Sequence, residues 1–306
     1  CLRAGLKVVL HEMRPMRKSA AHQTGDLAEL VCSNSLKSTR RDSAPGLLKA
    51  EMTILDSLII PAATKASVPA DQALTVDRRL FSQYVTESLV AHPNFARIDE
   101  EVTDLPTRDA MLARDEAWIV ATGPLTGRAL ATQLAELTGG KNGLYFYDAI
   151  APVLEADSLD HCALFRANRY GDERAGCSSE SAGDYLNVPL NKDQYYAFVD
   201  AVIAAEKMPL HEFEEPKFFE ACLPIEVMID RGRDTLRFGP MKPVGLTDPR
   251  TGRYPYAAIQ LRVENAQASM YSMVGFQTKM KWPEQARVFR TIPGLQNAEF
   301  LRFGSV

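Results

Sequence analysis

The first fifteen residues, CLRAGLKVVLHEMRP, constrain the fold of this chain more than any other stretch. They predict the end of a helix, a stop at Gly5, a short apolar strand over Lys7–Leu10 and an acid at Glu12. In a dinucleotide-binding βαβ unit, the second strand ends in an Asp or Glu that hydrogen-bonds the ribose. The pattern is therefore half of such a unit, although any strand that ends in a carboxylate would look the same.

The other half of this unit would be a strand and a GxGxxG turn before the first helix. The sequence begins at Cys1, inside what would be the first helix, so it contains neither of these features. It also has no initiator Met. We expect both to lie outside the chain.

Later segments continue an α/β pattern. WIVATGPLTG predicts a strand at Trp118–Gly127 that runs into small residues, which would let the backbone approach a cofactor closely. Further helices are expected over Asp42–Ile60, Asp77–Ala91, Arg128–Leu137 and from Asn191 to Lys207, and a strand over Leu144–Tyr147. Asn191 and Gln194 predict a capping box, and Tyr195 and Phe198 a core stripe.

Composition and cysteine usage narrow the class of protein. A chain of 306 residues, 46% hydrophobic and with a net charge of −4, is long enough for a full core and has no apolar run of membrane-span length. Its five cysteines form no CxxC pair, which argues against a disulfide framework and a structural metal site. We expect a cytosolic protein with free thiols. Cys177 falls in a polar insertion, DERAGCSSESAG, and is expected to be incidental.

Two cysteines occur in motifs suited to chemistry. Cys32 lies in ELVCSNSLKS, beside hydrogen-bonding Ser, Asn and Lys side chains, and Cys222 lies in FFEACLPIEVM, between aromatic residues and a proline. A thiol titrates closer to neutral pH than other strong side-chain nucleophiles, so a modest environmental effect makes it reactive. A lone Cys is otherwise often a small core residue. A basic stretch follows Cys222 and provides a patch for nucleic acid, although such a run is often only a solvated face.

Six motifs then occur in a recognisable order: ELVCSNSLKS, SVPADQALTVDR, ATGPLT, FFEACLPIEVM, RFGPMKPVGL and VGFQTKMKW. In these motifs the chain resembles the folate- and FAD-dependent tRNA uracil-5-methyltransferases, the TrmFO family, over essentially its whole length. Members of that family also carry the GxGxxG turn and a C-terminal segment that completes the flavin site. The polar insertion, and Val188 where the family often has another Cys, are departures.

The resemblance implies a role for each cysteine. Carbon 5 of uracil is a poor nucleophile, so a thiolate first adds to carbon 6 and carbon 5 then attacks an electrophilic one-carbon unit. Cys222 would be this nucleophile, and Cys32, beside the flavin, the general base that removes the carbon 5 proton. The donor would be 5,10-methylenetetrahydrofolate, and FAD reduced by NAD(P)H would supply a hydride, without S-adenosylmethionine.

The resemblance also implies a Rossmann-like, glutathione-reductase-like FAD-binding domain, truncated, with an inserted α+β domain. We expect the FAD-binding domain at 1–150, the inserted substrate and RNA domain at 151–290, and the return to the FAD-binding domain at 291–306. The two cysteines would then lie in different domains that close over one uracil. Glu12 would hold the FAD ribose. Along the flavin would lie Ser33, Asn34, Ser35, Lys37, Thr122 and Gly123, and along the tRNA backbone Arg231, Arg233 and Lys242.

The resemblance implies that the product is the T-loop ribothymidine of tRNA, and several alternatives stay open at the level of sequence. The chain would fit a related enzyme that modifies wobble or rRNA uridines, or a non-catalytic RNA-binding fragment. A flavin or nicotinamide oxidoreductase acting on a small metabolite would need no thiol nucleophile. The motifs predict no metal and do not define an oligomeric state.

Overall fold

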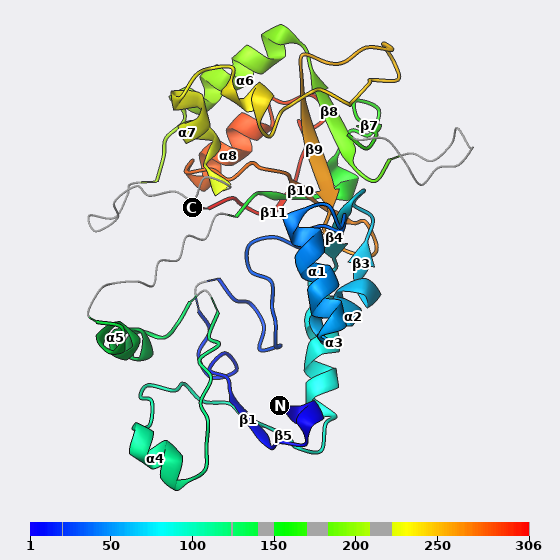
Figure 1. Ribbon diagram of the computed structural model, residues 1–306. Coiled ribbons are helices and arrows are strands. Elements are labelled where there is room, and N and C mark those ends of the chain that lie inside the picture. The colour runs from blue at the N-terminus through cyan, green and yellow to red at the C-terminus, as the bar shows by residue number, and fades with distance from the viewer. Residues whose placement is uncertain (20, 124, 140–149, 170–182, 209–221, 306) are drawn as a thin grey trace. The chain divides into compact units, whose positions relative to one another are not determined.

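The computed structural model describes residues 1–306 apart from 20, 124, 140–149, 170–182, 209–221 and 306 (Figure 1). The expectations for Leu144–Tyr147 and Cys177 lie outside the described residues. By its contacts the chain forms two compact units. The first combines Cys1–Val31 with Ser82–Tyr147, and the second combines Cys32–Phe81 with Asp148–Val306. The predicted domain boundaries at 150 and 290 stay a prediction.

The first unit contains the strand predicted at Lys7–Leu10 from the N-terminal pattern. The 3-10 turn η1 (Leu2–Ala4) ends at Gly5, whose φ of 79° is a left-handed conformation that glycine adopts without a steric penalty. Strand β1 (Val8–His11) follows and pairs in parallel with β5 (Phe95–Ile98). The unit also contains the helices α4 (Arg108–Ala113) and α5 (Arg128–Leu137), and most of α3 (Arg78–Val90).

The strand predicted at Trp118–Gly127 is wrong, because no element forms there. A strand needs a neighbour to hydrogen-bond with, and none of the described strands pairs with this run. Its apolar residues stay at the surface, where Ile119 is 77% exposed. The Trp118 ring instead stacks on the ring of His11, with the centroids 5.6 Å apart.

The second unit is built on a six-stranded antiparallel sheet with the order β11-β6-β10-β9-β8-β7. Residues that face the helices are fully buried along β8 and β9, including Val188 and Ile259. The strands are β6 (Val153–Glu155), β7 (Phe165–Arg166), β8 (Leu186–Leu190), β9 (Ala257–Val263), β10 (Met270–Met273) and β11 (Phe300–Arg302).

Three helices, α6 (Lys192–Ala204), α7 (Ile225–Asp230) and α8 (Trp282–Phe289), lie together beside this sheet (Figure 1). The predicted capping box is confirmed, because the Asn191 side chain accepts from the amide of Gln194 and the Gln194 side chain accepts from the amide of Asn191. The predicted core stripe is also confirmed, since Tyr195 and Phe198 are at most 1% exposed. The 3-10 turns η2 (Ala156–Ser158) and η4 (Thr235–Phe238) complete the larger part of the unit.

A small antiparallel sheet of β2 (Ser35–Ser38), β4 (Ala73–Val76) and β3 (Ser67–Val68) also belongs to the second unit. The helix predicted between positions 42 and 60 is broken into α1 (Ala44–Ile54) and α2 (Ile59–Lys65). Asp56, between them, adopts a left-handed φ of 56°, and the hydroxyl of Ser57 accepts from the amide that opens α2. Apolar spacing alone does not reveal such a break, because the residues on either side keep the same period.

Candidate functional site

Cys32 is a half-buried cysteine that forms no disulfide, in the loop directly before β2. Two arginines hold this loop. Arg78, at the start of α3, donates from Nη2 to the backbone carbonyl of Cys32 at 3.4 Å. Arg262, on β9, donates from Nη2 to the hydroxyl of Ser33 at 3.1 Å. Cys32 therefore lies in a loop that positively charged side chains hold from two separate elements.

A buried carboxylate links the two arginines. The Glu264 side chain is 5% exposed, and its Oε2 accepts from Arg78 Nε at 3.0 Å. Its Oε1 lies 3.9 Å from Arg262 Nη2. Burial lowers the pKa of Arg262, and the charge of Glu264 raises it in part. A guanidinium stays protonated in proteins, so these three residues form a group of two cations and one anion, which we name the Cys32 charge cluster.

Asn34 is the most deeply buried residue of the motif, with no exposed surface. Its side-chain amide donates to the carbonyl of Val263 at 3.0 Å, and its backbone carbonyl accepts from the amide of Val76 at 2.9 Å. Its buried Oδ1 has no hydrogen-bond partner in the described part of the chain. The structure thus places Asn34 in the packing of the motif, as the link between the Cys32 loop and two strands.

The remaining predicted residues of this motif lie on β2. Ser35 pairs with Thr75 of β4, and its hydroxyl accepts from the amide of Lys37 at 3.2 Å. Lys37 is exposed and has a φ of 65°, which is uncommon for a residue with a side chain. The motif therefore begins in packed structure and ends at the surface.

Cys222 is a second half-buried cysteine, and Leu223 and the N-cap Pro224 separate it from α7. Glu226, in the first turn of that helix, is 5% exposed. Its Oε1 accepts from the hydroxyl of Thr278 and from the amides of Lys279 and Met280, at 3.0 and 3.2 Å for the two amides. One carboxylate thereby ties the Cys222 motif to the VGFQTKMKW motif. The aromatic residues and Glu220 before Cys222 lie outside the described residues.

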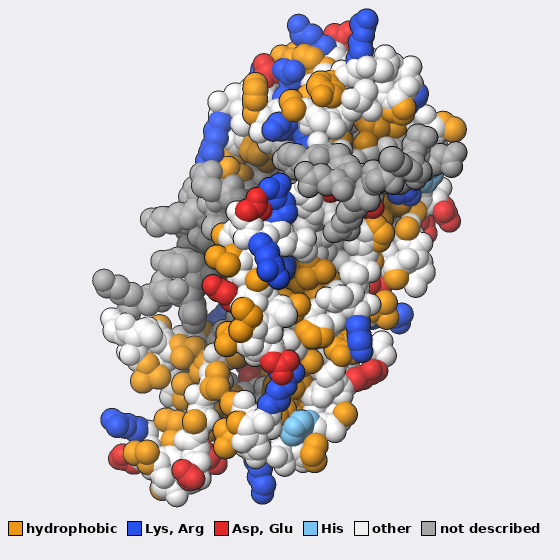
Figure 2. Space-filling model, turned by 45° about the vertical axis from the view of Figure 1, so that its right-hand side comes forward, with side chains coloured by type: hydrophobic (Ala, Val, Ile, Leu, Met, Phe, Trp, Pro, Cys, Tyr) orange, Lys and Arg blue, Asp and Glu red, His pale blue; other side chains and the backbone are white. Residues whose placement is uncertain are grey.

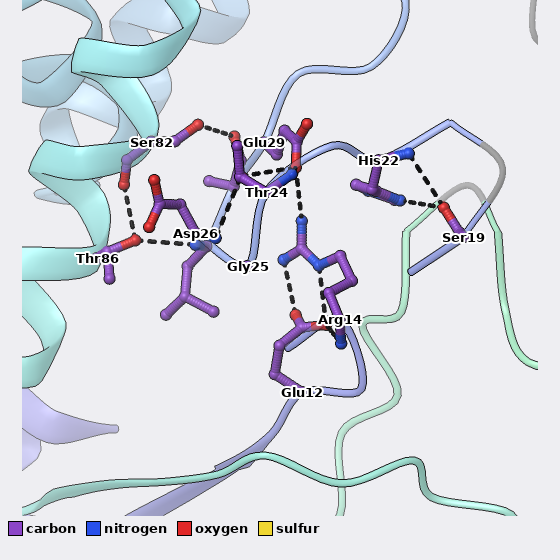
Figure 3. A network of polar contacts seen from close by, with 12 residues as sticks. Glu12, Arg14, Ser19, His22, Thr24, Gly25, Asp26, Glu29, Ser82 and Thr86 are labelled. Carbon is purple, nitrogen blue, oxygen red and sulfur yellow. Dashed lines mark hydrogen bonds and ion pairs between the residues drawn. The ribbon is translucent and has the colours of Figure 1, made fainter. Parts of the chain in front are cut away.

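Glu12 directly follows β1 in the first unit and belongs to the polar network of Figure 3. Arg14, which is 7% exposed, donates to Glu12 from Nε at 2.8 Å and from Nη2 at 2.7 Å. Arg14 also lies 3.6 Å from the carboxylate of Glu29. Partial burial alone raises the pKa of the Glu12 carboxyl, but the hydrogen bonds and charge of Arg14 together outweigh it and hold this pKa below its ordinary value.

The segment after β1 is held in place around Glu29. This carboxylate accepts from the amide and the hydroxyl of Thr24 at 3.1 and 2.9 Å. The amide of Leu27 donates to the hydroxyl of Thr86 on α3 at 2.8 Å (Figure 3). The ordered segment keeps Arg14, and with it the Glu12 carboxylate, in one orientation at the end of β1.

Thr122 and Gly123 also belong to the first unit. The Thr122 hydroxyl lies 2.7 Å from the hydroxyl of Thr126, and Thr122 is exposed whereas Thr126 is half-buried. Gly123 has a φ of 69°, and no described atom lies within 4 Å of where its Cβ would be. The predicted flavin-side residues are thus divided between the units, with Glu12 in the same unit as Thr122 and Gly123. Both predicted catalytic cysteines lie in the second unit, whereas they were expected in different domains.

One of the predicted RNA-binding residues, Arg233, lies beside an acidic partner. Arg233 pairs with Asp200 at 2.6 Å and lies over the ring of Tyr196, 5.5 Å from its centroid. Arg231 is the C-cap of α7, and Lys242 is half-buried. On the face shown in Figure 2, basic side chains are scattered with acidic ones among them. This arrangement gives local contacts for a phosphate backbone and no broad basic field on that face.

Two cavities are present in the described part of the second unit. One, of about 210 Å³, is lined by Glu226 with Lys207 and Lys279. The other, of about 460 Å³, is lined by residues of β3 and β4 together with Asp71 and Asp184. Neither cysteine lines either of these two cavities. The described residues contain no group of three or more His, Cys, Asp or Glu that would hold a metal ion. Within the same residues no helix combines the length and apolarity needed to cross a membrane.

Sequence reasoning missed the residues that hold the two cysteine loops. Arg78 ends the SVPADQALTVDR motif, and Glu264 directly follows the buried strand β9. A charged residue directly after a buried strand is a usable signal, because burial of a lone charge is costly and implies a partner. Arg262 was noticed only as part of the basic stretch, and its partners could not be predicted because they lie far away in sequence.

The described units define an α/β protein, as predicted. Two solved crystal forms of Aquifex aeolicus GidA share this fold with a TM-score of 0.55. Form II is 12% identical over 90% of this chain and 48% of that chain. Form I is 14% identical over 90% of this chain and 50% of that chain.

Sequence comparison places the chain more narrowly. The family model described as "Glucose inhibited division protein A" matches residues 1–306, and the chain belongs to this family. Among curated relatives, the methylenetetrahydrofolate--tRNA-(uracil-5-)-methyltransferase TrmFO of Geobacter sulfurreducens is 54% identical over 99% of this chain and 66% of the relative. The protein of the same name from Koribacter versatilis is 51% identical over 100% of this chain and 66% of the relative. That of Moorella thermoacetica is 53% identical over 99% of this chain and 65% of the relative.

These identities confirm the resemblance that the six motifs carry. The chain spans 65–66% of the length of these three relatives.

Proposed function

We propose that this protein carries out the methylenetetrahydrofolate- and FAD-dependent methylation of uracil carbon 5 in tRNA. The observation that carries the proposal is the 54% identity over 302 residues to an enzyme named for that reaction. The two cysteines of these motifs lie in or next to segments that buried ionic side chains hold in place. A target in wobble uridines or rRNA is the alternative, and the choice of RNA in the experiment below distinguishes the rRNA target.

Glu12 fits the role of holding an FAD ribose. A carboxylate has about four acceptor positions. Arg14 fills two on Oε1, with its amide and Nε, and one on Oε2, with Nη2. The side chain is 16% exposed, so a ribose hydroxyl has both an acceptor and access. Thr122 and Gly123 would lie along the flavin, with the Gly123 backbone unobstructed by a side chain. Bound FAD would supply a hydride and would be reduced again by NAD(P)H.

Cys222 would act as the nucleophile. Its thiolate adds to carbon 6 of uracil, so that carbon 5 gains the electron density to form a bond with the methylene carbon of the folate. The Cys222–carbon 6 bond breaks in the last step, when a hydride reaches the exocyclic methylene and the sulfur leaves as a thiolate. Glu226 holds the start of α7 against the Thr278 segment, so Cys222 is presented from a fixed helix end.

Cys32 would act as the general base. Its thiolate accepts the carbon 5 proton as tetrahydrofolate leaves with the electrons of the carbon–nitrogen bond, which gives the exocyclic methylene. The thiol must be ionised before it can accept this proton. The Ser33–Lys37 segment would lie along the flavin and the pterin, and Arg231, Arg233 and Lys242 would contact tRNA phosphates.

Trapping with 5-fluorouridine tests the nucleophile. A tRNA that carries 5-fluorouridine cannot lose its carbon 5 substituent, so the thiol adduct should persist in the presence of the folate and be visible by denaturing electrophoresis. The variant Cys222→Ala should form no adduct, whereas the matched control Cys162→Ala, which removes an exposed free thiol of the same unit, should form it normally. Adduct formation by Cys222→Ala would contradict the assignment. An adduct with rRNA but not with tRNA would support the alternative target.

The assignment of Cys32 as the general base is tested by a separate experiment. Cys32→Ala should add to the uracil of ordinary tRNA but release no methylated product, because the carbon 5 proton has no acceptor. Multiple turnover by Cys32→Ala would show that another group removes the proton.

A further inference from the structure

Three consecutive residues of the Cys32 loop are held by three separate contacts. Arg78 binds the backbone of Cys32, Arg262 binds the side chain of Ser33, and the carbonyl of Val263 accepts from Asn34. Two of these partners are neighbours on β9, and the third opens α3. The loop is therefore fixed at each residue from Cys32 to Asn34, which is more than a surface turn requires.

The charges of these contacts do not cancel. Arg78 and Arg262 each carry one positive charge, and Glu264 carries one negative charge between them. The three side chains are 22%, 14% and 5% exposed, so water screens them incompletely. The Nε–H of Arg262 is buried and makes no hydrogen bond to any described residue. The Cys32 charge cluster thus has a surplus of one positive charge beside a thiol.

Two further ionisable groups face this region. Asp77 is buried, and its carboxylate accepts from the amides of Arg79, Leu80 and Ala266. These three amides stabilise the Asp77 carboxylate at the start of α3, which keeps its negative charge. Tyr185, before β8, stays neutral because burial raises the pKa of its hydroxyl. Arg169 binds Gln260 on β9, so Arg78 and Arg262 are the two cations with a hydrogen bond to the Cys32 loop among the described residues.

We propose that Arg262 is a positioning residue for Cys32, which holds the loop through Ser33 and, together with Arg78, stabilises negative charge on the Cys32 sulfur. The inference rests on the proposed function, in which Cys32 has to be ionised to accept a proton. An arginine suits this role because it keeps its charge at every working pH while its planar fork binds the loop. Glu264 keeps both guanidinium groups in place, and its single negative charge neutralises only one of their two positive charges.

The test compares two alkylating reagents at Cys32 in the purified protein. Iodoacetate is an anion, iodoacetamide is neutral, and both attack the same thiolate, so the ratio of their rates reports local charge and is insensitive to general exposure. The rates are measured by mass spectrometry of the Cys32 peptide. Arg262→Gln should lower the ratio roughly fivefold or more, because one positive charge is removed from a site that water screens incompletely. Arg262→Lys keeps the positive charge and should therefore keep most of the wild-type ratio.

Arg287→Gln is the matched control, because it makes the same change in net charge on α8, where Arg287 pairs with Glu284. The ratio at Cys32 should not change in this control. An unchanged ratio in Arg262→Gln, or an equal decrease in Arg287→Gln, would overturn the proposal.

The wild-type protein gives a second measurement should Arg262→Gln fail to fold. The ratio at Cys32 should exceed the ratio at the exposed Cys162 in the same digest and should fall toward it as salt is added. Equal ratios at all salt concentrations would also overturn the proposal. None of these readouts uses RNA, folate or flavin, so their failure is distinct from a failure of the 5-fluorouridine trap.

Discussion

The side-chain amide of Asn34 donates a hydrogen bond to the backbone carbonyl of Val263 at 3.0 Å, although 229 residues separate them in sequence. The backbone carbonyl of Asn34 accepts from Val76 on the small sheet. The residue that follows Ser33 therefore joins both sheets of the second unit to the Cys32 loop. A thiol that must reach one atom of a substrate benefits from this rigidity, because catalytic groups lose efficiency when they are displaced by about an ångström.

Replacing Asn34 should destabilise the second unit. Asn34→Ala leaves the carbonyl of Val263 without its donor in a buried site, so we expect a loss of about 1–3 kcal/mol in the free energy of unfolding. Urea denaturation followed by circular dichroism measures it. The control is Asn94→Ala, which removes the same amide-to-carbonyl contact at an exposed position. Its effect should be within about 0.5 kcal/mol of zero. Equal losses of unfolding free energy in the two variants would show that the buried hydrogen bond of Asn34 contributes no more stability than the solvent-exposed one of Asn94.

Glu226 should tolerate an amide far better than a truncation. Glu226→Ala leaves the Thr278 hydroxyl and two backbone amides without their shared acceptor, for which we expect a loss of about 2–5 kcal/mol. Glu226→Gln keeps an oxygen in that position and places the NH2 group where the carboxylate oxygen has no hydrogen-bond partner among the described residues. It should therefore cost much less. Chemical denaturation of both variants measures this difference in the free energy of unfolding. The rate at which the 5-fluorouridine adduct forms should also fall in Glu226→Ala, because the helix end that follows Cys222 is no longer held in place. If both variants lost the same free energy of unfolding, the hydrogen bonds that Glu226 Oε1 accepts would not be the main stabilising interaction of this residue.

Local signals in the sequence predicted local structure well. The capping box at Asn191 and the glycine stop at Gly5 are formed by residues within a few positions of each other, so their partners are visible in the sequence. The strand expected at Trp118 failed for the opposite reason. An apolar run becomes a strand only when another strand hydrogen-bonds with it, and the run itself does not identify that neighbour.

The candidate site shows the same division. The motifs identified Cys32 and Cys222 as the residues of interest. The sequence did not show that Arg262 would reach Ser33 or that Glu226 would reach Thr278, because these contacts depend on how distant strands and helices pack. It also assigned Cys32 to the first 150 residues as a block, whereas the contacts of Cys32–Phe81 are with the second unit.

Lys242 should contribute to tRNA binding in a salt-dependent way. Its neighbours in the basic stretch are tied to acids, as Arg233 is to Asp200. Lys242→Gln should weaken tRNA binding and reduce the slope of log Kd against log salt by about 1, the value for one lost phosphate contact. Filter binding over a range of salt concentrations measures the slope. Arg287→Gln, an exposed arginine paired within its own helix, is the control and should leave the slope unchanged. An unchanged slope for Lys242→Gln would remove Lys242 from the RNA path.

Glu12 should make the stability of the first unit sensitive to acid. Burial alone raises the pKa of this carboxyl, but Arg14 holds it below the ordinary value of 4.5 that applies in the unfolded chain. A depressed pKa in the folded state means that the stabilisation is present above about pH 4.5 and is lost as the pH falls through the folded value. The free energy of unfolding of the wild type should therefore exceed that of Glu12→Gln near neutral pH, and the difference should shrink in acid. In an Arg14→Gln background this pH dependence should be lost or reversed in sign, because the partner that lowers the pKa of the Glu12 carboxyl is absent and burial then raises it. A difference between wild type and Glu12→Gln that stays constant with pH would show that Arg14 does not stabilise the ionised carboxylate.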